Sequence, residues 1–198
     1  MREGWTEACL RDVAILIMGQ SPPGASFNAD GVGVPFIQGA AEFGPRIPTI
    51  AKWSTSPTRM AEAGDILMSV RAPVGALNRT DGALAIGRGV AAIRGRGGTT
   101  TEFLALALVA CQAELRRRST SGMFESITKA EFESVQVPVP PLDERRRIVD
   151  IISTLDDEVA ALKSTARTAR TMRVGLLSEL LSGNHEIPST YDRLLEAA

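Results

Sequence analysis

GDILMSVRAPVGALNRTDGALAIGRG, residues 64–89, decides the fold of this chain. Short apolar runs alternate in it with glycine, proline and asparagine, a pattern that predicts a small β-meander. Arg71, Arg79 and Arg88 stand beside turn-forming residues, where side chains are commonly exposed. The segment contains no histidine, no cysteine and no adjacent pair of carboxylates. It therefore predicts a binding surface rather than a catalytic centre.

The same pattern covers the first half of the chain. Between Trp5 and Arg96, turn-forming residues separate five apolar runs of strand length, AILIM, VPFI, ILMSV, ALAIG and VAAI. Such runs predict a β-rich domain with hairpins and loops. The loop at 19–33, GQSPPGASFNADGVG, is long and polar, which is typical of a binding loop.

A helix is predicted after these strands. Thr99 and Glu102 fit a capping box, and apolar residues then recur at helical spacing as far as RRRSTSG at 116–122. The segment MFESITKAEFESVQVPVPP, residues 123–141, predicts a short helical turn and one more strand. Its prolines have a fixed φ and form a stiff boundary. The first part of the chain is therefore an α+β domain.

A long helix is predicted beyond that boundary, with Asp143 as its N-cap and Gly183 just past its end. Some forty residues make a rod of about 60 Å. Apolar residues step along it by four and three alternately, as in the seam of a coiled coil. One helix cannot bury such a seam against itself, so a partner helix is predicted. The proposed contacts are Ile148, Ile152, Leu155, Val159, Leu162, Met172, Leu176 and Leu180.

Charge is distributed unevenly along a chain whose net charge is −1. Residues 46–96 hold eight basic and three acidic residues, a local charge of +5. A basic face of this kind can hold phosphates, although a solvated surface of alternating charge explains this excess of basic residues equally well.

Several classes of protein are excluded by what the sequence lacks. No stretch approaches the roughly eighteen apolar residues of a membrane span. Cys9 and Cys111 belong to no CxxC pair, which predicts reduced thiols and a cytoplasmic location. The single histidine, His185, argues against a metal site. Phosphate-binding GxxxxGK and base-holding Asn-Pro-Pro-aromatic stretches are absent, so no catalytic residue is assigned and a binding protein is expected.

Three blocks together carry a resemblance to a known family. GDILMSVRAPVGALNRTDGALAIGRGVAAIRG at 64–95, SITKAEFESVQVPVPPLDERRRIVDII at 126–152 and LLSELLSGN at 176–184 resemble the specificity subunits of type I restriction–modification enzymes. The resemblance begins at LRDVAILIMGQSPPG, residues 10–24, and so covers most of the chain. It implies target recognition domains that each read half of a split DNA sequence, long helices that pair antiparallel, and methyltransferase subunits that dock on the assembly.

The chain departs from that family in length, because it has one recognition domain and one long helix. The resemblance then implies residues 1–142 as recognition domain, 143–183 as dimerisation helix and 184–198 as tail. We expect a second copy to pair antiparallel with this one, and an isologous dimer of identical domains should read a palindrome. The expected partners are double-stranded DNA, a second copy, and methyltransferase subunits with or without a restriction subunit. No cofactor is expected here, S-adenosylmethionine being held by the methyltransferase subunit of a bacterial or archaeal cytoplasm.

A smaller departure lies at the start of the long helix. The family commonly has Glu-Gln where this chain has Glu144 and Arg145, so a contact of that glutamine is in doubt. Residues 145–147 are all arginine, and cations at a helix N-terminus are unfavourable by a few tenths of a kcal/mol each. Asp143, Glu144 and Asp150, or acidic groups of a partner, can offset them; the local acids are favoured.

The basic segment and its neighbours supply the predicted DNA contacts. Asn78 and Arg79, in a turn-like tip, are favoured for contact in a groove, and Lys52 for the DNA backbone. Arg71 is as readily a brace for loop carbonyls, and Arg88 as readily a buried ion pair. Two other classes stay open: a coiled-coil interaction module, and a detached recognition part of a DNA methyltransferase or nuclease. The full set of predicted contacts is Gln20, Ser21, Lys52, Arg71, Asn78, Arg79, Arg88, Ser121 and Lys129.

Overall fold

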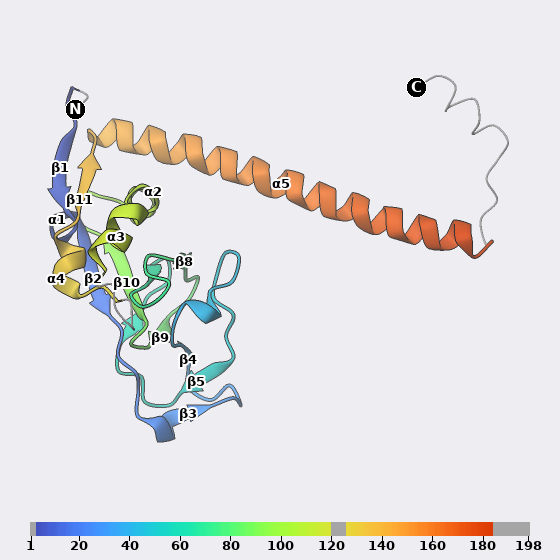
Figure 1. Cartoon of the computed structure of the whole chain (residues 1–198), viewed down its shortest axis with the longest axis horizontal. Helices are drawn as coiled ribbons and strands as arrows, with labels where there is room; N and C mark the ends of the chain where they lie inside the picture. The colour runs from blue at the N-terminus through green and yellow to red at the C-terminus, as the bar shows by residue number, and fades with distance from the viewer. Residues whose placement is uncertain (1–2, 120–125, 184–198) are drawn as a thin grey trace. The chain divides into compact units, whose positions relative to one another are not determined.

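The structure is a computed structural model that describes residues 3–119 and 126–183 (Figure 1). The chain divides into two compact units, Met1–Val149 and Asp150–Ala198. The first is an α+β domain and the second continues the long helix, so the predicted fold class is confirmed. The expected boundary at 142/143 lies at the first turn of that helix, whereas the compact domain runs on to Val149. Ser121 and the tail lie outside the described residues.

Three sheets make up the strands of the domain. The central sheet has the order β2-β10-β7-β8, a second sheet has β3-β5-β4-β9-β6, and β1 pairs with β11. The five apolar runs that predicted strands form β2, β4, β7, β9 and β10. The bounds are β1 Thr6–Cys9, β2 Ala14–Met18, β3 Phe27–Asn28, β4 Val34–Ile37, β5 Lys52–Ser54, β6 Met60–Ala61, β7 Ile66–Ser69, β8 Leu77–Arg79, β9 Leu84–Ile86, β10 Val90–Gly95 and β11 Gln136–Val139.

The meander prediction is wrong in one respect. Strands β7 and β8 form an antiparallel hairpin, but β9 leaves this sheet and pairs parallel with β4. The chain then returns with β10, which lies between β2 and β7. Residues 64–89 therefore link the two larger sheets, which a period of apolar residues does not reveal.

The predicted helices occur in order, with shifts at their starts, but the one helix predicted from Thr99 to the arginine run is divided at Cys111 into α2 and α3, and α1 was not predicted. Thr100, not Thr99, caps α2, because its Oγ1 accepts a hydrogen bond from the Phe103 N–H at 3.3 Å. The long helix begins one residue before Asp143, and Gly183 follows it with a φ of +73° that favours glycine. The bounds are α1 Leu10–Val13, α2 Thr101–Ala110, α3 Gln112–Arg118, α4 Lys129–Glu133 and α5 Leu142–Leu181, with 3-10 turns η1 Gly24–Ser26 and η2 Ala40–Glu42.

The central sheet is buried on both faces. In β7, Ile66 and Met68 face the larger core, whereas Leu67 between them faces a smaller core shared with β4 and β9. In β10, Ile93 faces the larger core and Val90 faces the smaller one. Because successive side chains of a strand point to opposite faces, both strands need apolar residues at nearly every position.

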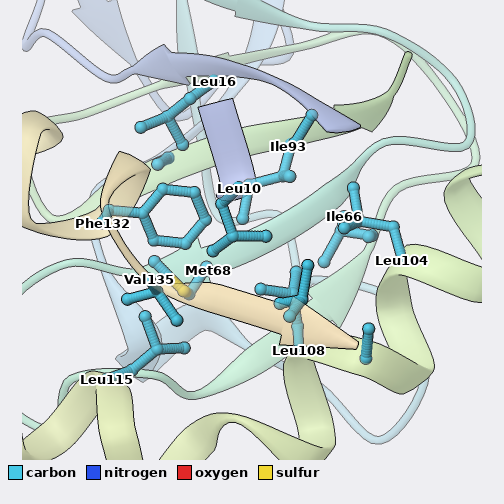
Figure 2. Close-up of a cluster of buried hydrophobic side chains, with 14 of the residues drawn as sticks. Leu10, Leu16, Ile66, Met68, Ile93, Leu104, Leu108, Leu115, Phe132 and Val135 are labelled. Atoms are coloured by element: carbon cyan, nitrogen blue, oxygen red, sulfur yellow. The ribbon is translucent and has the colours of Figure 1, made fainter. Parts of the chain in front are cut away.

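Helices cover the face of the sheet that carries the larger core (Figure 2). Leu104 and Leu108 of α2 and Phe132 of α4 meet Ile93 and Met68 there, and each is at most 1% exposed. Burying side chains of this size stabilises the fold by about 1.5–3 kcal/mol each. This core fixes the central sheet from one side.

A buried ion pair joins the central strands near the start of β7. The Asp65 carboxylate is 2% exposed and accepts from Arg94 Nε at 2.7 Å and Nη2 at 2.9 Å. Glu62 adds a second carboxylate 2.7 Å from Arg94 Nη1. The hydrogen bond that Arg94 donates to Asp65 raises the pKa of Arg94 well above its ordinary value. The pair therefore removes Arg94 from the charges available to a ligand.

The first two turns of α5 are attached to the domain. Arg145 Nη1 donates to the Gly98 carbonyl at 3.1 Å and to Thr99 Oγ1 at 3.0 Å. The prediction that local acids offset the charge of these arginines is therefore wrong for Arg145, because oxygens of Gly98 and Thr99 accept its hydrogen bonds. It holds for Arg146, which lies 3.8 Å from Asp143. The Trp5 indole N–H donates to Glu144 at 3.0 Å on the same part of the helix.

Replacement of Arg94 tests the buried ion pair. We expect Arg94→Met to lower the free energy of unfolding by about 2–4 kcal/mol, because the Asp65 carboxylate stays buried without its guanidinium. Arg96→Met is the matched control, since Arg96 is exposed two residues away. Urea unfolding followed by circular dichroism measures both, and equal stability of the two variants would contradict the assignment.

Candidate nucleic-acid interface

Four strand ends meet at one place in the domain. Beyond β2, the Gly19 N–H donates to Val90 O and the Gln20 N–H to Ile86 O, both at 2.9 Å. Beyond β4, the Gln38 carbonyl accepts from the Gly89 N–H at 3.1 Å. Beyond β7, the Val70 N–H donates to the same Gly89 at 2.9 Å. The side chains carried by these segments form what we term the strand-end cluster: Gln20, Ser21, Gln38, Arg71 and Arg88.

Glycines make this close crossing possible. A Cβ on Gly19 would lie 2.2 Å from the Gly87 carbonyl oxygen, and one on Gly89 would lie 2.5 Å from the Gln38 carbonyl oxygen. Real Cβ atoms do not approach backbone that closely, so larger residues would force the strand ends apart. The glycines of the opening segment therefore hold Arg88 between them at the turn from β9 to β10.

The cationic side chains of the strand-end cluster are exposed. Arg71 and Arg88 are exposed, and their guanidinium groups make no hydrogen bond or ion pair within residues 3–119 and 126–183. The alternatives of a loop brace for Arg71 and a buried ion pair for Arg88 therefore find no support among those residues. Gln20 is exposed beside them. Two cations and an amide thus point away from the domain without a competing partner in its described part.

Ser21 and Gln38 form the polar base of the strand-end cluster. Their side chains exchange hydrogen bonds, with Ser21 Oγ 3.3 Å from Gln38 Oε1 and 3.2 Å from Nε2. Sequence analysis missed Gln38, although it directly follows the run VPFI and precedes a glycine. That position, a polar residue at the end of a strand before Gly39, was the available signal.

The expected contact through Asn78 is not supported by its surroundings. Asn78 lies within β8, is 8% exposed, and donates its amide to the Gly44 carbonyl at 2.8 Å. The prediction that it sits at an exposed tip is wrong, because β8 pairs with β7 and directs the amide to a distant loop. Its role is to join β8 to that loop.

Arg79 is exposed but lies away from the strand-end cluster. It pairs with Ile66 at the start of β7, whereas Arg71 follows the end of that strand. Its Nη2 lies 3.1 Å from Glu102 Oε1, and the two side chains are 44% and 51% exposed. The pKa of Glu102 is lowered, chiefly by its own backbone N–H and also by Arg79. A contact of Arg79 with DNA stays a prediction.

The other predicted contacts are dispersed. Lys52 is exposed in β5, opposite Phe36 of β4. Lys129 is exposed in α4, where its Nζ lies 3.5 Å from Glu133. Ser121 lies outside the described residues. The structure therefore brings together Gln20, Ser21, Arg71 and Arg88 of the nine predicted contacts.

The basic segment keeps most of its charge available. Arg79 and Arg94 are paired with acids, as described above. The remaining six bases of residues 46–96 are exposed, and within the described parts of the chain their side chains have no ion-pair partner. They are Arg46, Lys52, Arg59, Arg71, Arg88 and Arg96.

The seam of α5 carries large exposed apolar side chains. Leu155, Leu162 and Met172 are 52%, 65% and 69% exposed. Ile148 differs, because it is partly buried against the larger core of its own domain. The helix lines an open apolar groove with Ala169, Met172, Arg173, Leu176, Leu177 and Leu180. An apolar surface of this kind is typical of a protein interface.

Two further searches concern metals and membranes. Within residues 3–119 and 126–183, His, Cys, Asp and Glu form no group that could hold a metal ion. Over the same residues, no helix has the length and apolar character needed to cross a bilayer.

Comparison with known families decides the identity of the fold. Residues 2–169 match the family model of the type I restriction modification DNA specificity domain. This chain belongs to that specificity family. A protein of Methanocaldococcus jannaschii, assigned as the specificity subunit of the type I restriction enzyme MjaX, is 34% identical over 169 residues. Those residues are 85% of this chain and 40% of that relative, so the chain spans less than half of its length.

Solved structures of the specificity family share the fold. The HsdS subunit from Thermoanaerobacter tengcongensis is 41% identical with a TM-score of 0.72, over 83% of this chain and 40% of that one. A chain from a study of complex assembly in a type I R-M system is 40% identical with a TM-score of 0.76, over 90% and 46%. The S subunit from M. genitalium, 15% identical with a TM-score of 0.67 over 90% and 46%, shares the fold alone.

An alanine at the crossing tests the geometry of the strand-end cluster. We expect Gly19→Ala to lower the free energy of unfolding by about 2–3 kcal/mol, since its Cβ would overlap backbone oxygens. Gly24→Ala is the control in the same loop, because a Cβ there meets nothing within 4 Å. Chemical denaturation compares them, and an unchanged midpoint for Gly19→Ala would show that the strand ends are not held this closely.

Proposed function

We propose that this chain is a sequence-specific DNA-binding specificity subunit of a type I restriction–modification complex. The observation that carries the proposal is the strand-end cluster, in which exposed Arg71, Arg88 and Gln20 come from three separated segments of the chain. Membership of the specificity family supports the same conclusion. The alternatives of an interaction module or a detached methyltransferase part give no account of these free cations.

The chemistry of the cluster suits contact with DNA. Arginine binds guanine through two parallel hydrogen bonds, and glutamine binds adenine in the same manner. Arg88 lies between two glycines that pack closely against Gln38, so its exposed side chain starts from a fixed stretch of backbone. Exposed bases outside the cluster, such as Lys52 and Arg59, would hold phosphates and set the register.

A second copy of the chain would complete the assembly. The exposed seam of α5 needs a helix of equal length, and a second copy supplies one. The chain spans about 40% of the length of the relatives it matches. Two identical domains related by a two-fold axis would read a palindrome.

The catalytic steps would belong to other subunits. In this proposal, methyltransferase subunits dock on the dimer and bind S-adenosylmethionine, and a restriction subunit joins them where the complex also cuts. The chain itself supplies recognition and no catalytic group. A cytoplasmic location, where the chain would meet chromosomal DNA, remains a prediction.

A methylome tests the proposed function directly. The chain is co-expressed with the methyltransferase subunit of its own system in a methylation-free host, and modified bases are sequenced. A new split palindrome carrying methyladenine supports both the specificity role and the two-fold dimer. An asymmetric split motif supports the role but replaces the homodimer with a pair of different chains. No new methylation, with both subunits expressed and folded, would return the chain to the interaction-module class.

Arginine replacements test which end of the domain meets DNA. We expect Arg88→Ala to cost about 1–3 kcal/mol in specific binding and to relax the preference at one position of each half-site. Arg96→Ala is the control of equal charge, because Arg96 follows the opposite end of β10, roughly 25 Å away. Affinity and sequence preference are measured with the assembled complex on a randomised DNA library. An unchanged preference for Arg88→Ala would remove this residue from the interface.

A further inference from the structure

The seam of α5 changes in residue size along its length. Before Ser164 its members are large, and Leu155, Val159 and Leu162 are each at least 45% exposed. After Ser164 come two small members, Ala166 and Ala169, and then larger ones resume. A pairing that leaves neither voids nor clashes must set large residues against small ones.

Parallel pairing in register fails this requirement. It would place Ala166 opposite Ala166 and Ala169 opposite Ala169, which leaves a void in each layer. It would also place Arg173 opposite its own copy, with two like charges inside the seam. The large layers on either side, such as Leu162 with Leu162, would be separated by these two voids.

Antiparallel pairing centred on Ser164 satisfies it at the two small members of the seam. A coiled-coil seam consists of alternating a and d positions. In this pairing each a position faces a d position of the second copy. Leu162 meets Ala166 of the second copy, and Val159 meets its Ala169. The layers outside these two are Ile152 with Leu176, Ile148 with Leu180, and Leu155 with the aliphatic stem of Arg173.

Charges beside the seam agree with the same centre except at Lys163, which would face Lys163 of the second copy beside the axis. Asp156 directly follows Leu155, and in this register it faces Arg170 of the second copy, twice by symmetry. Neither has an opposite charge three or four residues away on its own helix, and neither has an ion pair within the described residues. The flanking pair in the next heptad is apolar on both sides, Val149 with Leu177.

The neighbouring antiparallel register centred nearer the start of α5 would also give Asp156 a partner, Lys163 of the second copy, but it leaves more of the seam without apolar contact. Its centre lies between Ala160 and Ala161, so Leu176 would face Arg145 and Leu180 would face Pro141. Arg145 already donates to the Gly98 carbonyl of its own domain. Leu176, which is 51% exposed in the single chain, would stay without an apolar partner.

We propose that two copies of α5 pair antiparallel about a two-fold axis at the level of Ser164, locked by reciprocal Asp156–Arg170 pairs. This inference rests on the homodimer of the proposed function and adds its register. The occupant of the exposed seam is a second copy of this chain, and residue size along the seam decides between the two registers.

Charge reversal tests the register in the full chain. At low salt, where exposed charges are least screened, Asp156→Arg and Arg170→Asp should each weaken the dimer about tenfold, because two attractions become repulsions. The double variant should restore the dissociation constant to within about threefold of the original. Sedimentation equilibrium measures the dimer, and circular dichroism checks that α5 is intact.

Two matched sets complete the experiment. Asp157→Arg with Arg167→Asp carries the same charges outside the seam and should show no such loss and recovery. The double variant Asp156→Lys with Lys163→Asp should recover the dimer's dissociation constant only in the neighbouring register. Its recovery would therefore overturn the register centred on Ser164. A dimer whose dissociation constant is unchanged by all these reversals would also overturn the register, but not the homodimer. A monomeric unaltered chain at about 50 μM would overturn the homodimer itself.

Discussion

The burial of β7 and β10 on both faces is the constraint on which the domain depends. A strand that is apolar at nearly every position needs a layer on each side. Helices α2 and α4 supply one layer, and the sheet that contains β4 and β9 supplies the other. To build the second layer the chain must leave the central sheet after β8 and return to it after β9. The turn from β9 to β10 is therefore forced to cross the ends of β2 and β4.

This crossing explains why a glycine-rich segment carries exposed arginines. The strand ends approach so closely that backbone excludes a Cβ at Gly19 and Gly89, and the Gln38 and Phe36 side chains crowd the same position at Gly87. Arg88 lies between Gly87 and Gly89, and the path of the backbone there directs its side chain to solvent. The same packing that forms the smaller core thus presents a cation to solvent on a rigid support. Rigid support is what a base-reading side chain requires.

Local pattern predicted five of the strands (β2, β4, β7, β9 and β10), α4 with β11, and the long helix, because each depends on period and on turn residues nearby in the chain. It did not predict contacts between distant segments. Asn78 has the sequence surroundings of a turn, yet a carbonyl 34 residues earlier takes its amide. Thr99 has the spacing of a cap, yet Arg145 of the long helix binds it. Gln38 joined the strand-end cluster through Ser21, a pairing that neither segment reveals alone.

The proposed dimer gives the long helix a part in specificity as well as in assembly. Both copies carry the same strand-end cluster, so every contact with one half-site is repeated in the other. The register of α5 determines how far apart along the helix pair the two copies begin, because each residue advances the helix by about 1.5 Å. A seam of mixed large and small residues admits few registers, whereas a uniform seam would admit several. Residue size in a helix that touches no base would then restrict which pairs of half-sites the complex can read.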